Sequence, residues 1–355
     1  MKNILTVIAV LLAGFTLAQQ PVRVLTHSSF DLPVELLEEF TERTGWPVEL
    51  LPGGDAGEVV NRAVLTAGRP LADVLFGVDN SLLHRATAAG VFEPYESPRL
   101  ADVPAAFHLS DDHLVTPVDL GYVAFNIDVG WFETAGLPLP ETLADLTHPD
   151  YHGLTVVQDP AASSTGLAFM LTTISLFGED GATGWLDWWA DLRDNGLQVT
   201  SGWTDAYYTA FTRYGGDRPI VLSYASSPAA EVIFAEEPPE TAPTVNLLCE
   251  GCVWRQIEAA GVLAGAANPD GARAFIDFLL SDEVQAAIPM AMFVYPVVQG
   301  TELPAEFLEF AEVPEDLGVS LDPEEISDGQ EGWLLEWTRV VLQGASPEAA
   351  RRQAF

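Results

Sequence analysis

Positive charge is the scarcest feature of this chain. Among 355 residues there is a single lysine, Lys2, and lysine and arginine together number 15 against 52 aspartate and glutamate residues. The formal net charge is −37. Because binding to nucleic acid or to an anionic membrane needs basic patches, this composition argues against both kinds of partner. The excess of acidic residues indicates a solvated acidic surface. Attraction of cations by this charge is the alternative interpretation.

Membrane-spanning apolar runs are also lacking. The N-terminal run at residues 4–17 is about 14 residues long, whereas a membrane-spanning helix needs roughly 20. Lys2 precedes this run and the small residue Ala18 ends it, which is typical of a secretory signal peptide. We therefore expect residues 1–18 to be removed and the mature protein to be exported, soluble, and periplasmic or otherwise extracytoplasmic.

Cysteine is scarce as well, with two residues, Cys249 and Cys252, in the sequence CEGC. In an exported protein this spacing suits a local disulfide, a pair of free thiols, or a redox or metal site. No second CxxC completes a zinc site, and a strand-like run follows the motif where a redox pair would open a helix. A disulfide is the favoured interpretation, and a pair of free thiols is the alternative. No metal site is predicted.

Common catalytic motifs are missing too. The sequence contains no G-x-S-x-G elbow and no H-E-x-x-H motif. The histidines fall in no catalytic spacing; they are His27, His84, His108, His113, His148 and His152. We expect a protein that is not an enzyme and carries no cofactor, and an exported hydrolase is the alternative from a different class.

What the chain does contain is an alternation of short apolar runs and amphipathic stretches. In its first part, expected strands at residues 22–25, 48–51 and 73–77 are separated by helical patterns at 33–44 and 58–66. This β-α-β-α-β order argues for a parallel sheet covered by helices. The length of the chain predicts two domains.

A second set of strands is expected from residue 155 onward. Two further apolar runs, at 114–128 and 256–263, are candidates for strands that cross between the domains.

Polar and aromatic side chains follow several expected strands, where open α/β sheets bind ligands. Asp79 follows the third strand and is a candidate contact for a cation. Ser163 and Ser164 lie in a hydroxyl-rich loop that opens a helix, and free amides and hydroxyls there can hold a polar or anionic group. Trp203 and Tyr224 lie at strand–loop–helix junctions, from which residues of a cleft come.

Several runs carry a resemblance to a known family. General features of its class occur at residues 40–45, 72–92 and 274–281. The sharper runs are GVDNSLL at 77–83, QDP at 158–160, GWTDAY at 202–207, SYASSPA at 223–229 and YPV at 295–297. Together they resemble the extracytoplasmic thiamine-binding proteins of ABC transporters, within the type II solute-binding proteins. The resemblance covers nearly all of the mature chain.

This resemblance implies an α/β fold with two lobes, the type II periplasmic-binding-protein fold. Each lobe would be a mostly parallel sheet flanked by helices, and crossing hinge strands would join the two. We expect residues 19–116 and 262–297 in lobe 1, and residues 117–261 and 298–355 in lobe 2. The implied function is capture of thiamine, or of thiamine phosphate, by a monomer that delivers it by hinge closure to the permease and ATPase of an ABC importer.

The resemblance also implies roles at the site. Asp79 would face the thiazolium cation of thiamine, Trp203 and Tyr224 would stack on the ligand, and serines would hold its polar end. An aromatic face attracts a cation by roughly 0.5–2 kcal/mol, and a carboxylate adds attraction that grows as the closed cleft excludes water. The full set of expected ligand-binding residues is Asp79, Asn80, Trp203, Tyr207, Tyr224, Ser163, Ser164, His27 and Phe293.

The chain departs from the family pattern at three positions. His27 stands where a tyrosine is expected, Ala230 where a second tyrosine is expected, and Phe293 where a tryptophan is expected. These changes predict a roomier pocket or a related ligand. A ferric-iron or other small-cation binder on the same fold is the alternative, because His27, Tyr207 and Tyr208 are residue types that ligate iron.

Overall fold

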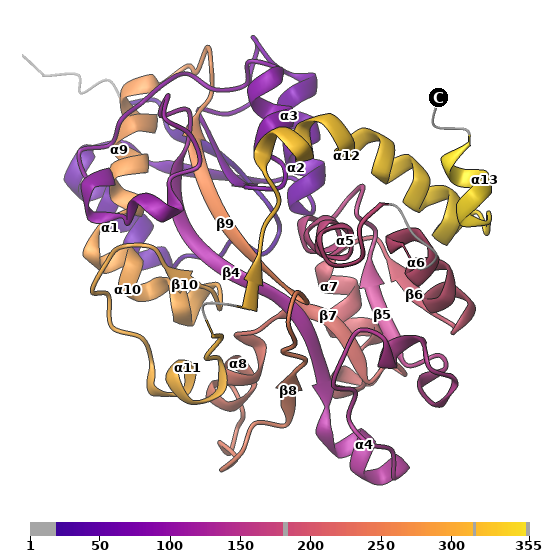
Figure 1. Ribbon diagram of the computed structural model, residues 1–355. Helices are drawn as coiled ribbons and strands as arrows, with labels where there is room; N and C mark the ends of the chain where they lie inside the picture. The colour runs from indigo at the N-terminus through magenta and orange to yellow at the C-terminus, as the bar shows by residue number, and fades with distance from the viewer. Residues whose placement is uncertain (1–18, 180–183, 315–316, 353–355) are drawn as a thin grey trace, which may run out of the picture.

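The computed structural model describes residues 19–179, 184–314 and 317–352. The expected signal peptide at residues 1–18 lies outside the described residues. In the described part of the chain, eleven strands form one sheet with helices packed around it (Figure 1). No helix in this part is both long and apolar enough to cross a membrane.

Three parallel strands form one end of the sheet. Strand β1 (Val22–Thr26) lies between β2 (Val48–Pro52) and β3 (Val74–Asp79). Helices α1 (Val34–Thr44) and α2 (Ala56–Leu65) connect these strands in the β-α-β-α-β order that the sequence predicts. All of β3 is buried, which accounts for its continuous apolar run. We call this end of the molecule the first lobe.

The opposite end of the sheet, which we call the second lobe, is built in the same way. Strand β5 (Thr155–Gln158) pairs in parallel with β6 (Gln198–Thr200) and with β7 (Ile220–Tyr224). Its helices include α5 (Ser164–Phe177) and α6 (Trp185–Asp194), and the tryptophans of α6 are buried in the core.

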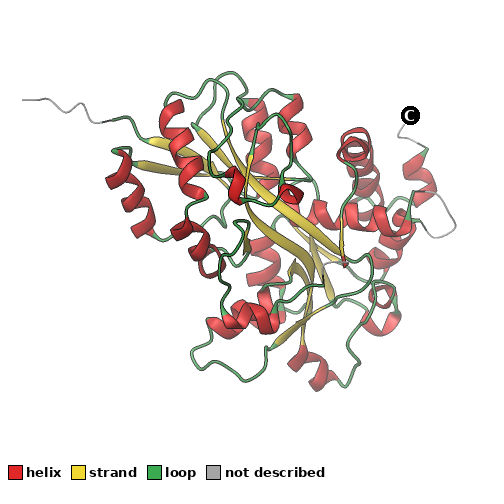
Figure 2. Cartoon of the chain, turned by 60° about the vertical axis from the view of Figure 1, so that its left-hand side comes forward, coloured by secondary structure: helices red, strands yellow, loops and turns green. Residues whose placement is uncertain are grey.

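Two long strands join the lobes. Strands β4 (Thr116–Asp128) and β9 (Val253–Val262) run antiparallel beside each other, close to the runs that the sequence marks as crossing strands. Strand β9 also pairs with β3, and β4 with β7, so the ladder is continuous from lobe to lobe. Figure 2 shows these strands extending between the two lobes. Bending them would move the lobes as a hinge does. The exact lobe boundaries stay a prediction.

The C-terminal part of the chain covers both lobes. Its helices are α9 (Pro269–Leu279), α10 (Asp282–Ala291), α11 (Ala305–Phe310), α12 (Pro323–Trp337) and α13 (Pro347–Arg351). Helix α12 contacts the first lobe where Gln330 Nε2 donates a 2.8 Å hydrogen bond to Ser81 O. It contacts the second lobe where Trp337 packs edge-on against Trp189, with ring centroids 5.4 Å apart. This helix therefore lies across the hinge.

The two cysteines are joined in the structure. Cys249 and Cys252 form a disulfide with their Cα atoms 5.4 Å apart, just before β9. This is the interpretation that the sequence favours.

Alkylation without reductant should label no cysteine, as read by mass spectrometry of the intact protein. Because the bridge closes a loop of only a few residues, its reduction should cost at most about 2 kcal/mol of unfolding free energy. A Cys249→Ser, Cys252→Ser double variant that unfolds far more easily than this would contradict the expectation. Quantitative labelling of the untreated protein would also contradict it.

Candidate functional site: an acidic, aromatic cleft between the lobes

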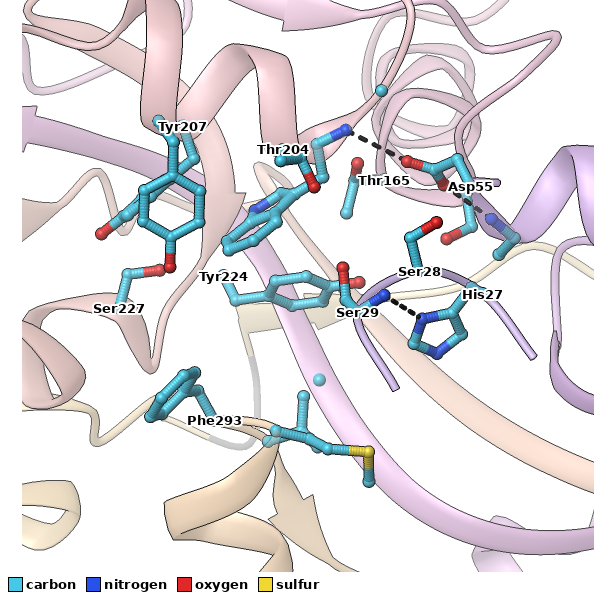
Figure 3. Close-up of a pocket in the computed structure, with 18 of the residues that line it drawn as sticks. His27, Ser28, Ser29, Asp55, Thr165, Thr204, Tyr207, Tyr224, Ser227 and Phe293 are labelled. Atoms are coloured by element: carbon cyan, nitrogen blue, oxygen red, sulfur yellow. Dashed lines mark hydrogen bonds between the residues drawn. The ribbon is translucent and has the colours of Figure 1, made fainter. Parts of the chain in front are cut away.

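A cleft of about 650 Å³ lies where the two lobes meet the crossing strands (Figure 3). The first lobe contributes residues 27–29 after β1, and residues 54–56 and 58 after β2. The second lobe contributes residues 201–205 after β6 and the start of α5. Because the carboxyl ends of parallel strands meet at one edge of each sheet, both lobes present polar loops to the same space.

Aromatic rings from the second lobe form one wall. The ring of Trp203, in the short helix α7 (Trp203–Asp205), stacks on that of Tyr207 with centroids 5.0 Å apart and 15° between the planes. Its Nε1 donates a 2.8 Å hydrogen bond to Ser223 Oγ, which fixes the ring. Tyr208 and Tyr214 line the same wall. This wall presents flat, electron-rich faces to a ligand.

Tyr224 forms the floor beside the crossing strands. Its hydroxyl donates a 2.8 Å hydrogen bond to Gln256 Oε1 on β9. The ring lies directly against Gly121 of β4, where an added Cβ would come within 2.7 Å of Tyr224 Cε1. Glycine at this position is therefore what allows the tyrosine ring to lie flat over the strand.

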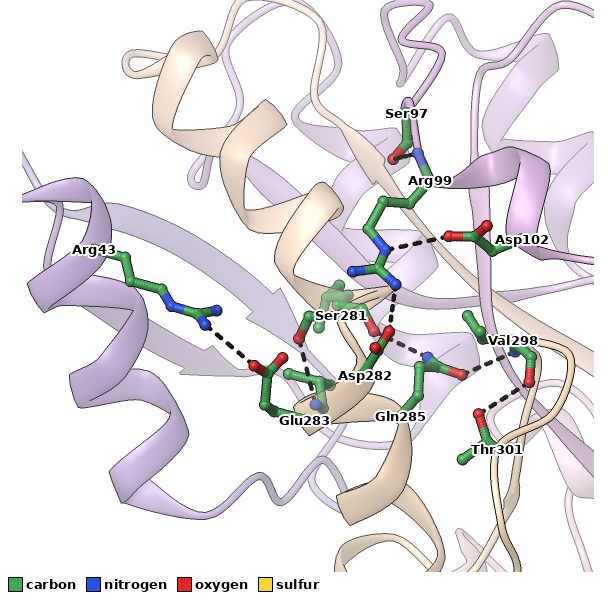
Figure 4. A network of polar contacts seen from close by, with 12 residues as sticks. Arg43, Ser97, Arg99, Asp102, Ser281, Asp282, Glu283, Gln285, Val298 and Thr301 are labelled. Atoms are coloured by element: carbon green, nitrogen blue, oxygen red, sulfur yellow. Dashed lines mark hydrogen bonds and ion pairs between the residues drawn. The ribbon is translucent and has the colours of Figure 1, made fainter.

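Phe293 enters the cleft from the loop that follows α10. Polar contacts hold this helix in place, among them the 3.1 Å pair of Arg43 with Glu283 (Figure 4). Gln285 Oε1 accepts hydrogen bonds from the amides of Val297 and Val298, which ties α10 to the next segment. Phe293 itself has a φ of 58°, a conformation uncommon for a non-glycine residue. The contacts that hold α10 in place therefore also hold the loop that carries the Phe293 ring at the cleft.

Carboxylates dominate the charge of the cleft. The acidic residues that line it are Asp55, Glu58, Asp119, Asp205, Glu231 and Glu258. Among the described lining residues, His27 and Arg213 oppose them, and Arg213 Nε is already paired with Glu231 Oε2 at 3.1 Å. A cleft that combines acid with aromatic faces suits a flat organic cation.

The most concentrated acid lies in the crossing strands. In the register of β3, β9 and β4, Glu258 pairs with Asp79 on one side and with Asp119 on the other. Burial raises the pKa of Asp79 to about 6. Burial, and then the charge of Glu258, hold the pKa of Asp119 well above its usual range. The carboxyl groups of Asp79 and Asp119 therefore keep their protons to a higher pH than exposed aspartates do.

His27 adds a fourth titratable group to this cluster. Its Nε2 lies 3.2 Å from Glu258 Oε1. Burial acts to lower the pKa of His27, but Glu258 and the more distant Asp55 and Asp79 together raise it above its usual value. At acid pH the imidazolium would place positive charge beside the cleft.

The structure brings most of the expected site residues together. Those that line the cleft are His27, Ser164, Trp203, Tyr207, Tyr224 and Phe293. Ala230 lines it too, so the position where a second tyrosine was expected leaves open space.

Asp79 lies behind the cleft rather than on its surface. Its Oδ1 accepts hydrogen bonds from Ser81 N at 2.8 Å, Ser81 Oγ at 2.6 Å and Leu82 N at 3.0 Å. Its Oδ2 accepts from Gln256 Nε2. The turn after β3 draws the carboxylate into its own backbone, because an aspartate at such a position satisfies free amides. The hydrogen bond of Asp79 toward the cleft goes to Gln256, which lines it.

Asn80 and Ser163 are also absent from the lining residues. Asn80 clamps β9, since its Oδ1 accepts from Ile257 N at 3.0 Å and its Nδ2 donates to Arg255 O at 3.2 Å. Ser163 is buried, with its Oγ 2.9 Å from Thr165 Oγ1. Both residues hold elements that shape the cleft.

Sequence reasoning missed all six of the acidic residues that line the cleft. Asp119 and Glu258 are isolated acidic residues within the apolar runs of the crossing strands, and that isolation was the available signal. Asp55 lies shortly after β2 and Asp79 is the last residue of β3, so the strand-end rule that selected Asp79 applies equally to Asp55.

Comparison with known proteins places the chain in a family. Residues 69–312 match the model of the bacterial extracellular solute-binding proteins. The chain is 32% identical over 290 residues to the thiamine-binding periplasmic protein of Escherichia coli (strain K12), covering 81% of this chain and 82% of that protein. It is 26% identical over 327 residues to iron uptake protein A1 of Synechocystis sp. (strain ATCC 27184 / PCC 6803 / Kazusa), covering 89% and 88%.

Structural comparison agrees with this placement. A solved periplasmic thiamin binding protein superposes with a TM-score of 0.79 at 28% identity, covering 90% of this chain and 96% of that one. The fold is the two-lobed α/β fold of type II periplasmic binding proteins, as the sequence predicts. The chain belongs to the bacterial extracellular solute-binding proteins.

Proposed function

We propose that this protein captures thiamine outside the cytoplasm and delivers it to an ABC importer. The observation that carries the proposal is the cleft itself, where stacked aromatic rings face a cluster of carboxylates. Thiamine joins a permanently charged thiazolium ring to a flat aminopyrimidine. The rings of the second lobe offer faces for stacking, and the acidic cluster offers charge for the cation.

The ligand would touch both lobes at once. Trp203 and Tyr224 belong to the second lobe, whereas His27 reaches the cleft from the first. A ligand held between them favours the closed arrangement of the lobes by its differential affinity for that state. Phe293 would cover the ligand from the α10 loop, and Ser164 would meet its polar end.

The residues behind the cleft would act as positioning residues. Asp79 orients Gln256, whose Oε1 in turn accepts a hydrogen bond from the Tyr224 hydroxyl. Asn80 holds β9 in register with β3, and Ser163 supports the start of α5 through Thr165. Their substitution should change affinity through the shape of the cleft.

A ferric-iron function is less well supported by the same residues. Tyrosine ligates iron as the phenolate, and burial, followed by the charge of Glu231, raises the pKa of Tyr207 well above its usual value. The Tyr207 hydroxyl also donates a 2.7 Å hydrogen bond to Glu231 Oε1. Across residues 19–179, 184–314 and 317–352, no group of three or more His, Cys, Asp or Glu residues could hold a metal ion.

The relatives bear on the cellular setting. The similar Escherichia coli and Salmonella typhimurium proteins are named as periplasmic thiamine-binding proteins. We infer export of this chain, binding without catalysis, action as a monomer, and a permease and ATPase as its membrane partners.

Calorimetry of the protein, refolded to remove any ligand carried through purification, tests this function. Thiamine should bind at one site with a Kd below about 1 µM, and ferric citrate should give no comparable heat. Chromatography of the recovered thiamine should show no turnover product. Binding of ferric ion with a tyrosinate absorption band, and no binding of thiamine, would replace this proposal with the iron function.

A further inference from the structure

Phe234 is an exposed aromatic residue at the edge of the cleft. It follows helix α8 (Ser227–Ile233), which comes after β7 in the second lobe. The residue lines the cleft although 58% of its surface is exposed to water. A large apolar ring that meets water at a concave surface is a feature of ligand-binding sites.

One face of α8 borders the cleft. The residues of this face that line the cleft are Ser227, Ala230, Glu231 and Phe234. Their spacing of i, i+3, i+4 and i+7 is that of a single helix face. Ala230 presents only a methyl group there, and the amide of Phe234 donates a 3.0 Å hydrogen bond to Ala230 O, one turn earlier. The helix therefore places its aromatic ring at its far end and leaves space beside Ala230.

Helix α8 holds Phe293 from both of its ends. Ser226, the residue before α8, donates a hydrogen bond from its Oγ to Phe293 O. The Phe234 ring meets the Phe293 ring edge-on, with centroids 5.0 Å apart and 80° between the planes, an arrangement that aromatic pairs prefer. Phe293 comes from the other lobe, since Val284 and Ile288 of α10 share a buried core with β1 and β3. The two rings therefore form a wall that spans both lobes.

The two ends of the cleft differ in polarity. Apolar side chains line the end at α8, and they are those of Ala230, Phe234, Ala235, Met292, Phe293 and Val294. Figure 3 shows Phe293 on the side of Tyr224 away from Asp55 and His27. Glu258 lies beside His27, so its carboxylate belongs to the opposite, polar end. A ligand whose cation meets the carboxylates therefore has an apolar surface available for an uncharged ring.

We propose that Phe234 is a further ligand-binding residue, which contacts the uncharged aromatic ring of the ligand, and this inference rests on the proposed function. In thiamine that ring is the aminopyrimidine. The aminopyrimidine and the hydroxyethyl group extend from opposite sides of the thiazolium, so a ligand whose hydroxyl end meets Ser164 directs its aminopyrimidine toward the apolar end of the cleft. There the Phe234 ring adds apolar contact, and the space beside Ala230 admits the substituents of the pyrimidine.

Calorimetry with two ligands tests the inference. The second ligand is an analogue of thiamine in which an ethyl group replaces the aminopyrimidinylmethyl group, so that the cation stays and the uncharged ring is lost. Phe234→Ala should weaken thiamine binding by about 5- to 20-fold. It should change the affinity for the analogue, measured by displacement of thiamine, by less than about twofold.

Leu308→Ala is the matched control. Leu308 is 62% exposed, lies on the helix α11 that packs against α8, and is not among the described residues that line the cleft. This variant should bind both ligands as the wild type does. A nuclear Overhauser effect gives an independent readout, because the methyl group of the bound aminopyrimidine should show one to the ring protons of Phe234. Their loss in Phe234→Leu identifies these protons.

The outcomes separate this inference from the proposed function. Unchanged thiamine affinity in Phe234→Ala, an equal loss for both ligands, or the absence of the Overhauser effect overturns the role of Phe234 while the proposed function stands. Failure of the wild-type protein to bind thiamine overturns the proposed function itself. Thermal unfolding checks that each variant folds. If Phe234→Ala does not, Phe234→Leu replaces it in the calorimetry, with a smaller loss expected for thiamine and none for the analogue.

Discussion

Trp203→Ala should weaken thiamine binding by about 30- to 150-fold, equivalent to about 2–3 kcal/mol. The ring is half-buried, stacks on Tyr207 and is fixed by its hydrogen bond to Ser223. Its loss removes both apolar contact, worth about 1.5–3 kcal/mol for a large side chain, and attraction of roughly 0.5–2 kcal/mol between an aromatic face and a cation. Calorimetry measures the loss, and most of the ligand-induced change in tryptophan fluorescence should disappear with it.

Two variants control this prediction. Trp203→Phe keeps an aromatic face but loses the indole N–H that bonds Ser223, so its affinity should fall between those of the wild type and Trp203→Ala. Trp188→Phe changes a tryptophan of α6 that is buried in the core and is not among the residues lining the cleft, and it should bind thiamine as the wild type does. A folded Trp203→Ala protein with wild-type affinity would remove this ring from the site.

Thiamine affinity should also fall as the pH is lowered from about 8 to about 5.5, because the carboxylates around Glu258 take up protons. The pKa of Asp79 is raised to about 6, and that of Asp119 is raised too. A bound cation favours the ionised carboxylates, so binding releases protons in this range and the affinity rises with pH until the groups are ionised. Protonation of His27 acts in the same direction.

Glu258→Gln should test the same cluster most directly. At about pH 8 it should lower thiamine affinity by about 10- to 100-fold, since it removes a carboxylate that lines the cleft. Because Glu258 contributes to the raised pKa values of Asp119, Asp79 and His27, its removal should also flatten the pH dependence. Calorimetry in two buffers of different ionisation enthalpy counts the protons released. An unchanged slope of log Kd against pH would contradict the assignment.

The stability of the ligand-free protein should change with pH in the opposite sense. A carboxyl group whose pKa is raised on folding contributes stability that is present below its unfolded pKa and is lost as the pH rises through its folded pKa. For Asp79 this loss occurs as the pH rises toward and through about 6. The thermal midpoint of the free protein should therefore decrease over the range in which thiamine affinity increases, which separates the effect on the site from general unfolding.

Local patterns in the sequence were sufficient for much of the fold. The β-α-β order of β1 to β3 follows from alternating apolar runs and helical periodicity, and both signals depend only on neighbours in the chain. The strand-end rule was sufficient to find Trp203, Tyr224 and Ser164, because a residue that follows a parallel strand lies at the same edge of the sheet whatever the rest of the fold does. The resemblance then supplied the two-lobed arrangement and the ligand class.

The direction and partners of the acidic side chains were decided by tertiary structure. Asp79 and Asp55 both lie near the carboxyl ends of parallel strands. Asp79 nevertheless accepts hydrogen bonds from its own turn, whereas Asp55 accepts one from Trp203 N across the cleft. Asp119 and Glu258 become a pair only through the register of β4 with β9, a contact between residues 139 positions apart in the numbering. Charge in a cleft depends on which distant segments share it, and no local pattern of residues contains that information.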